Sequence, residues 1–64
     1  MEVKNGFLIF TDFDGELCCV RVNAIESVHL DEDEHLFVAT SRRIYRVHSA
    51  DALFVSKVLE MISL

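Results

Sequence analysis

The sequence predicts an α+β fold: an antiparallel β-meander of four to five strands with one C-terminal α-helix packed on one face. Short segments rich in branched and aromatic residues recur between residues 7 and 48, and turn-forming residues separate them. Residues 49–62 instead repeat apolar side chains at helical spacing. The length of 64 residues allows a single domain, 1–64, that buries only roughly 60% of the surface of its unfolded chain.

The first two predicted strands, Phe7–Asp12 and Leu17–Val22, flank the turn sequence "FDGE". Gly15 suits the left-handed position of a three-residue hairpin loop. We expect the register that results to place apolar residues opposite each other: Phe10 faces Cys18, and Leu8 faces Val20.

Three further strands are predicted at Ile25–Leu30, His35–Thr40 and Arg43–His48. A three-residue loop, Glu32–Glu34, would join the first two of these and set their register. Apolar residues then face each other across this hairpin as well: Leu30 faces Leu36, and Val28 faces Val38.

The last predicted element is a helix of about three turns. Ser49 is a favoured N-cap residue, and Asp51 would lie in the first turn, where the helix dipole favours negative charge. We expect Val58 and Ile62 at the centre of the contact with the sheet and Phe54 nearby. The apolar arc of this helix spans about 200°, which is wider than one packed face needs.

Apolar residues also occur on both faces of the predicted sheet, and one helix can cover only one of them. Hydrophobic residues make up 52% of the chain. We therefore expect the second face to be covered by a homodimer partner or by another protein.

The net charge of −5 argues against direct nucleic-acid binding, because phosphate contacts need Lys and Arg, and it favours basic partner surfaces. No segment has the ~20 apolar residues that span a bilayer, and the start "MEVKNGFLIF" lacks the features of a signal peptide. The adjacent Cys18 and Cys19 cannot form an ordinary disulfide with each other, which suggests a reducing, cytoplasmic setting. We expect both to be buried apolar residues.

The segment "HLDEDEH", residues 29–35, has three readings. In the register above, His29, Asp31 and His35 share a face and could bind a divalent metal. The acids could also form a solvated turn that keeps the chain soluble. In the third reading they form an acidic surface for a protein partner. The candidate partner-binding residues are then Asp31, Glu32, Asp33, Glu34, Asp14 and Glu16.

No enzyme motif is visible: there is no Gly-x-Ser-x-Gly elbow and no glycine-rich phosphate loop. We expect no catalytic residues and no cofactor. The basic cluster Arg42, Arg43 and Arg46 is expected to pair with nearby carboxylates. Arg43 and Tyr45 should share one face of their strand, and Arg46 should point away from it.

Residues 14–62 resemble the small flagellar proteins of the FlbD type. The similarity lies in a glycine-turned hairpin at Gly15, Asn23 before the pair Ile25-Glu26, Val28, and a tail of two strands and a helix. The chain has "TSRRIY" where that family usually has a glycine in its last hairpin. The outline of a meander plus a helix also resembles PH-like and LytTR-type domains.

Two functional classes follow. The first is a non-enzymatic acidic protein that binds and occludes a basic surface of a partner, such as a phage-type inhibitor of a nucleic-acid-handling complex. The second, implied by the resemblance, is an FlbD-like regulatory or structural accessory protein. A metal-binding module that uses His29, Asp31 and His35 is the remaining alternative.

Overall fold

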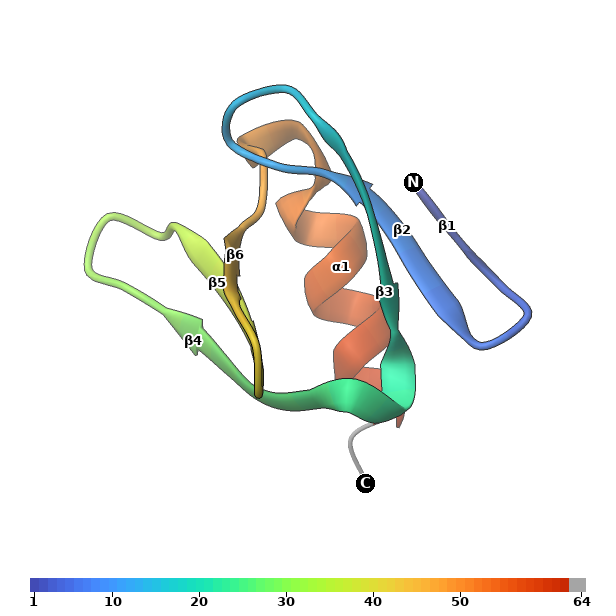
Figure 1. Cartoon of the computed structure of the whole chain (residues 1–64). Helices are drawn as coiled ribbons and strands as arrows, with labels where there is room; N and C mark the ends of the chain where they lie inside the picture. The colour runs from blue at the N-terminus through green and yellow to red at the C-terminus, as the bar shows by residue number, and fades with distance from the viewer. Residues whose placement is uncertain (63–64) are drawn as a thin grey trace.

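Two three-stranded antiparallel sheets and one helix make up the computed structural model of the chain, which describes the backbone of residues 1–62 and the side chains through Met61. Figure 1 shows α1 between the sheets, with β2 and β3 on one side of it and β5 and β6 on the other. The α+β class and the C-terminal helix are confirmed, whereas the single meander is wrong. The elements are β1 (Glu2–Lys4), β2 (Phe7–Thr11), β3 (Leu17–Arg21), the 3₁₀ turn η1 (Val22–Ala24), β4 (Ile25–Leu30), β5 (Leu36–Thr40), β6 (Ile44–Arg46) and α1 (Ser49–Ile62).

The first sheet has the strand order β1-β2-β3, and β1 is an additional strand that the sequence pattern did not predict. An Asn5-Gly6 turn joins β1 to β2, with φ of 54° at Asn5 and 82° at Gly6. These left-handed angles are what a two-residue hairpin turn requires. The predicted pairings of Phe10 with Cys18 and of Leu8 with Val20 are confirmed in the β2–β3 hairpin.

The second sheet has the order β4-β5-β6, and its β4–β5 register is also as predicted: Val28 pairs with Val38, and Leu30 with Leu36. A register shift between Ile25 and Ser27 marks a bulge at the start of β4. Between the two sheets the chain turns through η1 instead of continuing into another hairpin. For this reason β3 and β4 are not paired in the described part of the chain, and the predicted meander divides into two sheets.

The two sheets meet just after β2, beyond the pairing of Ile9 with Glu2 at the start of β1. Asp12 forms an antiparallel bridge with Val47. Around it, the Phe13 N–H donates to the Arg46 carbonyl (2.8 Å) and the His48 N–H donates to the Thr11 carbonyl (2.9 Å). Because the Asp12 N–H donates to Glu16 on the β3 side, these bonds lie on the edge of β2 that β1 also uses. That edge is therefore shared between β1 and the end of β6.

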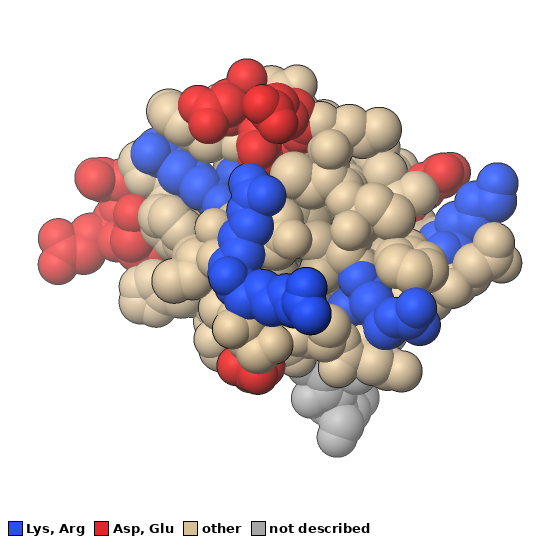
Figure 2. Space-filling view, viewed as in Figure 1, with Lys and Arg blue, Asp and Glu red and all other residues tan. Residues whose placement is uncertain are grey.

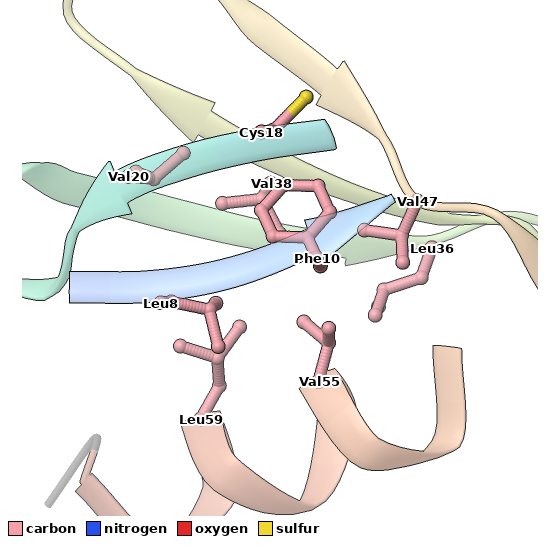
Figure 3. Close-up of a cluster of buried hydrophobic side chains, with 9 residues drawn as sticks. All are labelled: Leu8, Phe10, Cys18, Val20, Leu36, Val38, Val47, Val55 and Leu59. Atoms are coloured by element: carbon pink, nitrogen blue, oxygen red, sulfur yellow. The ribbon is translucent and has the colours of Figure 1, made fainter. Parts of the chain in front are cut away.

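The core lies between the inner faces of the sheets and α1 (Figure 3). Its largest fully buried side chains are Phe10, Leu8, Val38 and Val55. Tyr45 packs edge-on against Phe10, with ring centroids 5.9 Å apart and an interplanar angle of 82°. Alternation along β2 and β5 puts Leu8, Phe10 and Val38 inside, as the period of two in a β-strand requires.

The residues of α1 that face the core differ from those that we expected. Val55 and Leu59, one turn apart, are its buried apolar residues among those described, whereas Val58 is only partly buried, as is Phe54. The prediction of Val58 at the centre is therefore wrong, and the side chain of Ile62 lies outside the described residues. Because the apolar arc is so wide, the helical pattern alone does not fix which of its apolar residues face the core. The packing against the sheets decides this.

The helix begins at Ser49, one residue earlier than the predicted N-cap at Ser49 implies. The Ala50 N–H donates to Nδ1 of His48 (3.1 Å), so His48 performs the capping role that we predicted for Ser49. Asp51 lies in the first turn as predicted and is buried. Its Oδ2 accepts the Thr11 N–H at 2.8 Å, which joins the start of α1 to β2. Among residues 1–62, no helix combines the length and apolar character that crossing a membrane requires.

Candidate interaction site at the acidic turns

The turn between β4 and β5 is organised by the carboxylate of Asp31. Its Oδ1 accepts the backbone N–H groups of Asp33 (2.9 Å) and His35 (2.8 Å). The Asp31 N–H donates to the His35 carbonyl, and the Glu34 N–H donates to the Asp31 carbonyl. These N–H donors, that of His35 first, hold the pKa of Asp31 below its ordinary value of 3.8. Asp31 is thus a charged structural residue of the turn, while Glu32, Asp33 and Glu34 are exposed.

The turn between β2 and β3 has the same hydrogen-bond pattern. Oδ1 of Asp12 accepts the N–H groups of Asp14 and Glu16, both at 2.9 Å. The Asp12 N–H donates to the Glu16 carbonyl, and the Gly15 N–H donates to the Asp12 carbonyl. Asp14 and Glu16 are exposed.

The two turns differ at their fourth residue, which is left-handed in both. The first turn has Gly15 there, with φ of 87°, and the second has Glu34, with φ of 64°. Glycine adopts this conformation without strain, whereas a residue with a Cβ atom pays roughly 1–2 kcal/mol. A carboxylate therefore occupies a position of the second turn where glycine would be more stable.

Arg46 lies between the two turns. Its guanidinium stacks on the ring of Phe13, 3.6 Å from the centroid, and its Nη2 lies 3.1 Å from Nε2 of His35. Nδ1 of His35 lies 3.2 Å from Oδ2 of Asp31. Because an arginine can only donate, we assign the His35 proton to Nδ1, which donates to Asp31 and leaves Nε2 as the acceptor. Figure 2 shows the resulting surface: carboxylates at both turns, with basic side chains between them. The acids form two patches.

The predicted metal set is only partly brought together. Ligand atoms of Asp31, Asp33 and His35 lie within 4.8 Å of one another. His29 is not among them, because its ring packs on that of Phe37, with centroids 6.4 Å apart. Both oxygens of Asp31 already interact with the turn's own groups, so the carboxylate is engaged in holding the backbone.

Arg21, Arg43 and Arg46 interact with aromatic rings, and the expected pairing of the basic cluster with carboxylates is wrong. Arg43 lies over Tyr45, on the face that we predicted for both, and Arg21 lies over Phe7. Among the described residues no arginine is within ion-pair distance of a carboxylate. The aromatic partners therefore leave the exposed acids of both turns without intramolecular cations. The sequence indicated only that Arg46 and its strand neighbour Tyr45 point to opposite faces. The contacts of Arg46 with Phe13 and His35 depend on how the two sheets meet.

The cysteines differ from each other, although both were expected to be buried. Cys18 is buried and Cys19 is exposed, because neighbours on a strand point to opposite faces. Sγ of Cys18 lies 3.7 Å from Oδ2 of Asp12. Burial, and after it the charge of Asp12, raises the pKa of the Cys18 thiol above its ordinary value of 9.0. The thiol therefore stays protonated near neutral pH and is a poor nucleophile.

No protein-family model, no curated protein and no solved structure matches this chain. The resemblance to FlbD-type proteins, and to PH-like and LytTR-type domains, thus stays a prediction from the sequence. The functional argument depends on the geometry of the chain itself.

Proposed function

We propose that the chain is a non-enzymatic protein-interaction module that binds a basic surface of a partner protein through the β4–β5 turn. The observation that carries this proposal is the pairing of a rigid acidic turn with Glu34 in a left-handed conformation. A turn that served only as a connection would be more stable with glycine at this position. The carboxylates of Glu32, Asp33 and Glu34 are exposed and held on an ordered backbone, which suits electrostatic recognition.

The partner class follows from charge. Proteins that handle nucleic acids present Lys and Arg to phosphates, and an acidic surface competes for the same residues. We infer an inhibitor that occludes such a surface, of the kind that phages use, in a reducing cytoplasm where Cys19 stays a free thiol. Asp14 and Glu16 provide a second contact at the β2–β3 turn. An FlbD-like accessory role, in which sheet and helix faces make the contacts, is the competing proposal.

The test compares the two turns. The triple variant Glu32→Gln, Asp33→Asn, Glu34→Gln removes three charges and keeps Asp31, whose carboxylate holds the turn. A charge-matched comparison variant, Glu2→Gln, Asp14→Asn, Glu16→Gln, removes three charges at β1 and at the second contact, and serves as the control for net charge. A partner is first captured at low salt with the unmodified chain and then purified, and its association rate with each variant is measured.

We expect the first variant to associate about tenfold more slowly at low salt, with the difference shrinking as salt rises. The association rate of the control variant should fall clearly less. Equal rates for both variants and the unmodified chain would contradict the proposal. A partner whose contact surface is acidic or apolar would favour the accessory role.

We also propose that the chain forms a homodimer through the outer face of the first sheet. Leu17 is 73% exposed on that face, next to the exposed Cys19 and the partly buried Ile9. Sedimentation at micromolar concentration should show a dimer, and Leu17→Lys should yield a monomer with an unchanged fold. A monomer at all concentrations would contradict this proposal.

A further inference from the structure

β4 is the most exposed long strand of the molecule. It is the edge strand of its sheet and pairs only with β5. Val28 and Leu30 lie on its inner face, yet they are 43% and 59% exposed, because α1 packs mainly on β2 and β5. An uncovered edge strand with apolar inner residues is a template for pairing with another chain.

The free backbone groups of β4 can be assigned from the ladder. The Asp31 N–H donates to His35, and in an antiparallel pair the groups of every second residue face the same neighbour. His29 and Ser27 therefore also face β5. The N–H and C=O groups of Val28 and Leu30 face the open edge, where no strand among the described residues pairs with them.

A groove of about 590 Å³ runs along this edge between β4 and the second half of α1. Ile25, Val28 and Leu59 give it an apolar floor, and Ser56 lies on its helical wall. A chain added to the edge of β4 would point every second side chain into this groove. Backbone donors and acceptors and an apolar groove therefore lie side by side.

The charges around the groove define its occupant. Glu26 and Glu60 line it, and no Lys or Arg does. The acidic run 31–34 follows directly at the end of β4. A second copy of β4 at this edge would bring its own Glu26 and its own acidic run 31–34 close to the same groups. A segment with basic residues among apolar ones is complementary to both features.

We propose that β4 binds an extended segment of a partner protein as an added strand, whose apolar side chains enter the groove and whose Lys or Arg side chains meet Glu26 and Glu60. This proposal rests on the proposed function, because it takes the same basic partner and names the way in which it docks. Main-chain pairing at the edge supplies affinity, and the groove together with its two carboxylates supplies selectivity. The acidic turn then steers the segment toward the strand.

The experiment is a selection of random nine-residue peptides, displayed on phage, against the immobilised chain. The selected peptides are then synthesised and titrated against four variants. Leu30→Pro removes an edge N–H and leaves the ladder to β5 intact, since proline is tolerated at such positions. Its control Leu30→Ala loses the side chain and keeps the N–H. Ser56→Phe fills the groove, and Lys57→Phe adds the same ring at the next, exposed position outside the groove.

We expect selected peptides that alternate apolar residues with Lys or Arg. Leu30→Pro and Ser56→Phe should each weaken their binding about tenfold or more, while both controls bind nearly as well as the unmodified chain. Backbone amide signals of Val28 and Leu30 in the unmodified chain should shift when peptide is added. A dispersed amide spectrum of each variant shows that the variant is folded.

Other outcomes overturn the inference. Peptides that bind Leu30→Pro normally but fail on the triple variant of the acidic turn would refute docking on β4 and leave the proposed function standing. Selection of acidic peptides that bind at β4 would refute the basic partner that both the proposed function and the docking on β4 assume. No enrichment of any peptide, or a dimer that Leu30→Pro dissociates, would show that the edge does not take a basic segment.

Discussion

The β2–β3 and β4–β5 turns have one hydrogen-bond pattern but different surroundings. Asp12 is buried, and its second carboxylate oxygen faces the thiol of Cys18 in the core. Asp31 is partly exposed, and its second oxygen faces His35, which in turn contacts Arg46. The same local pattern thus anchors the core in one case and presents charge to solvent in the other. Four experiments can break or sharpen this comparison.

The largest difference is expected for loss of the organising carboxylate. Asp12→Ala removes a buried carboxylate that accepts two backbone N–H groups and contacts the Cys18 thiol, so we expect the free energy of unfolding to fall by about 3 kcal/mol. Asp31→Ala should cause a much smaller loss, since the Asp31 carboxylate is partly exposed and water can replace it. Urea denaturation of both variants measures this. Asp12→Asn, which keeps an acceptor oxygen, serves as the control; equal losses for Asp12→Ala and Asp31→Ala would show that burial does not separate the turns.

The fourth position of each turn should respond with opposite signs. Gly15→Ala should lower the free energy of unfolding by about 1 kcal/mol through backbone strain alone, because no atom lies within 4 Å of the added Cβ. Glu34→Gly should raise it by a similar amount. Glu34→Gln, with the same backbone preference as glutamate, is the control for charge. Thermal melts decide the sign, and destabilisation by Glu34→Gly would remove the main support for the proposed function.

Acid should release the β4–β5 turn only at low pH. The lowered pKa of Asp31 means that its contribution to stability is present above the ordinary carboxyl value of 3.8 and is lost as pH falls through the folded pKa. The amide signals of Asp33 and His35, which donate to this carboxylate, should therefore shift at a midpoint below 3.8. A midpoint above that value would mean that the turn does not stabilise the charge of Asp31.

The smallest effect concerns the Cys18 thiol beside Asp12, because here we expect a change in the labelling rate of the thiol and not in the free energy of unfolding. At pH 8, iodoacetamide should label the exposed Cys19 quickly and the buried Cys18 slowly, as intact mass and peptide mapping would show. Denaturant should make both rates equal. In Asp12→Asn, labelling of Cys18 should become faster, since one cause of its raised pKa is removed. Equal rates in the folded, unmodified chain would contradict the burial of Cys18.

Much of the fold was predictable because local alternation sets the hairpin registers. Leu8, Phe10, Val28 and Leu30 found their predicted partners. β1 was missed because its three residues are all exposed and carry no alternation, although the Asn5-Gly6 turn signals a hairpin. The division into two sheets depends on the bulge near Ser27 and on η1, which no periodicity encodes.

The candidate site was predictable in its position and less so in its construction. The run 31–34 had to be a turn, but a glutamate at position 34 does not signal a left-handed conformation as Gly15 does, so the carboxylate bonds of Asp31 were not readable from the sequence. The contact of Arg46 with Phe13 and His35 joins three segments, so only the tertiary structure brings it about. The groove beside β4 likewise arises because α1 leaves that strand uncovered.

The position of α1 in the chain has a consequence for synthesis. All six strands precede it, yet Val55 and Leu59 complete the core that covers Leu8 and Val38. On the ribosome, both sheets therefore emerge with their apolar inner faces open to water, and the core closes only when the helix has left the exit tunnel. During that interval, nascent chains are exposed to aggregation and to chaperones, and the acidic turns of the two hairpins are already present to keep neighbouring chains apart.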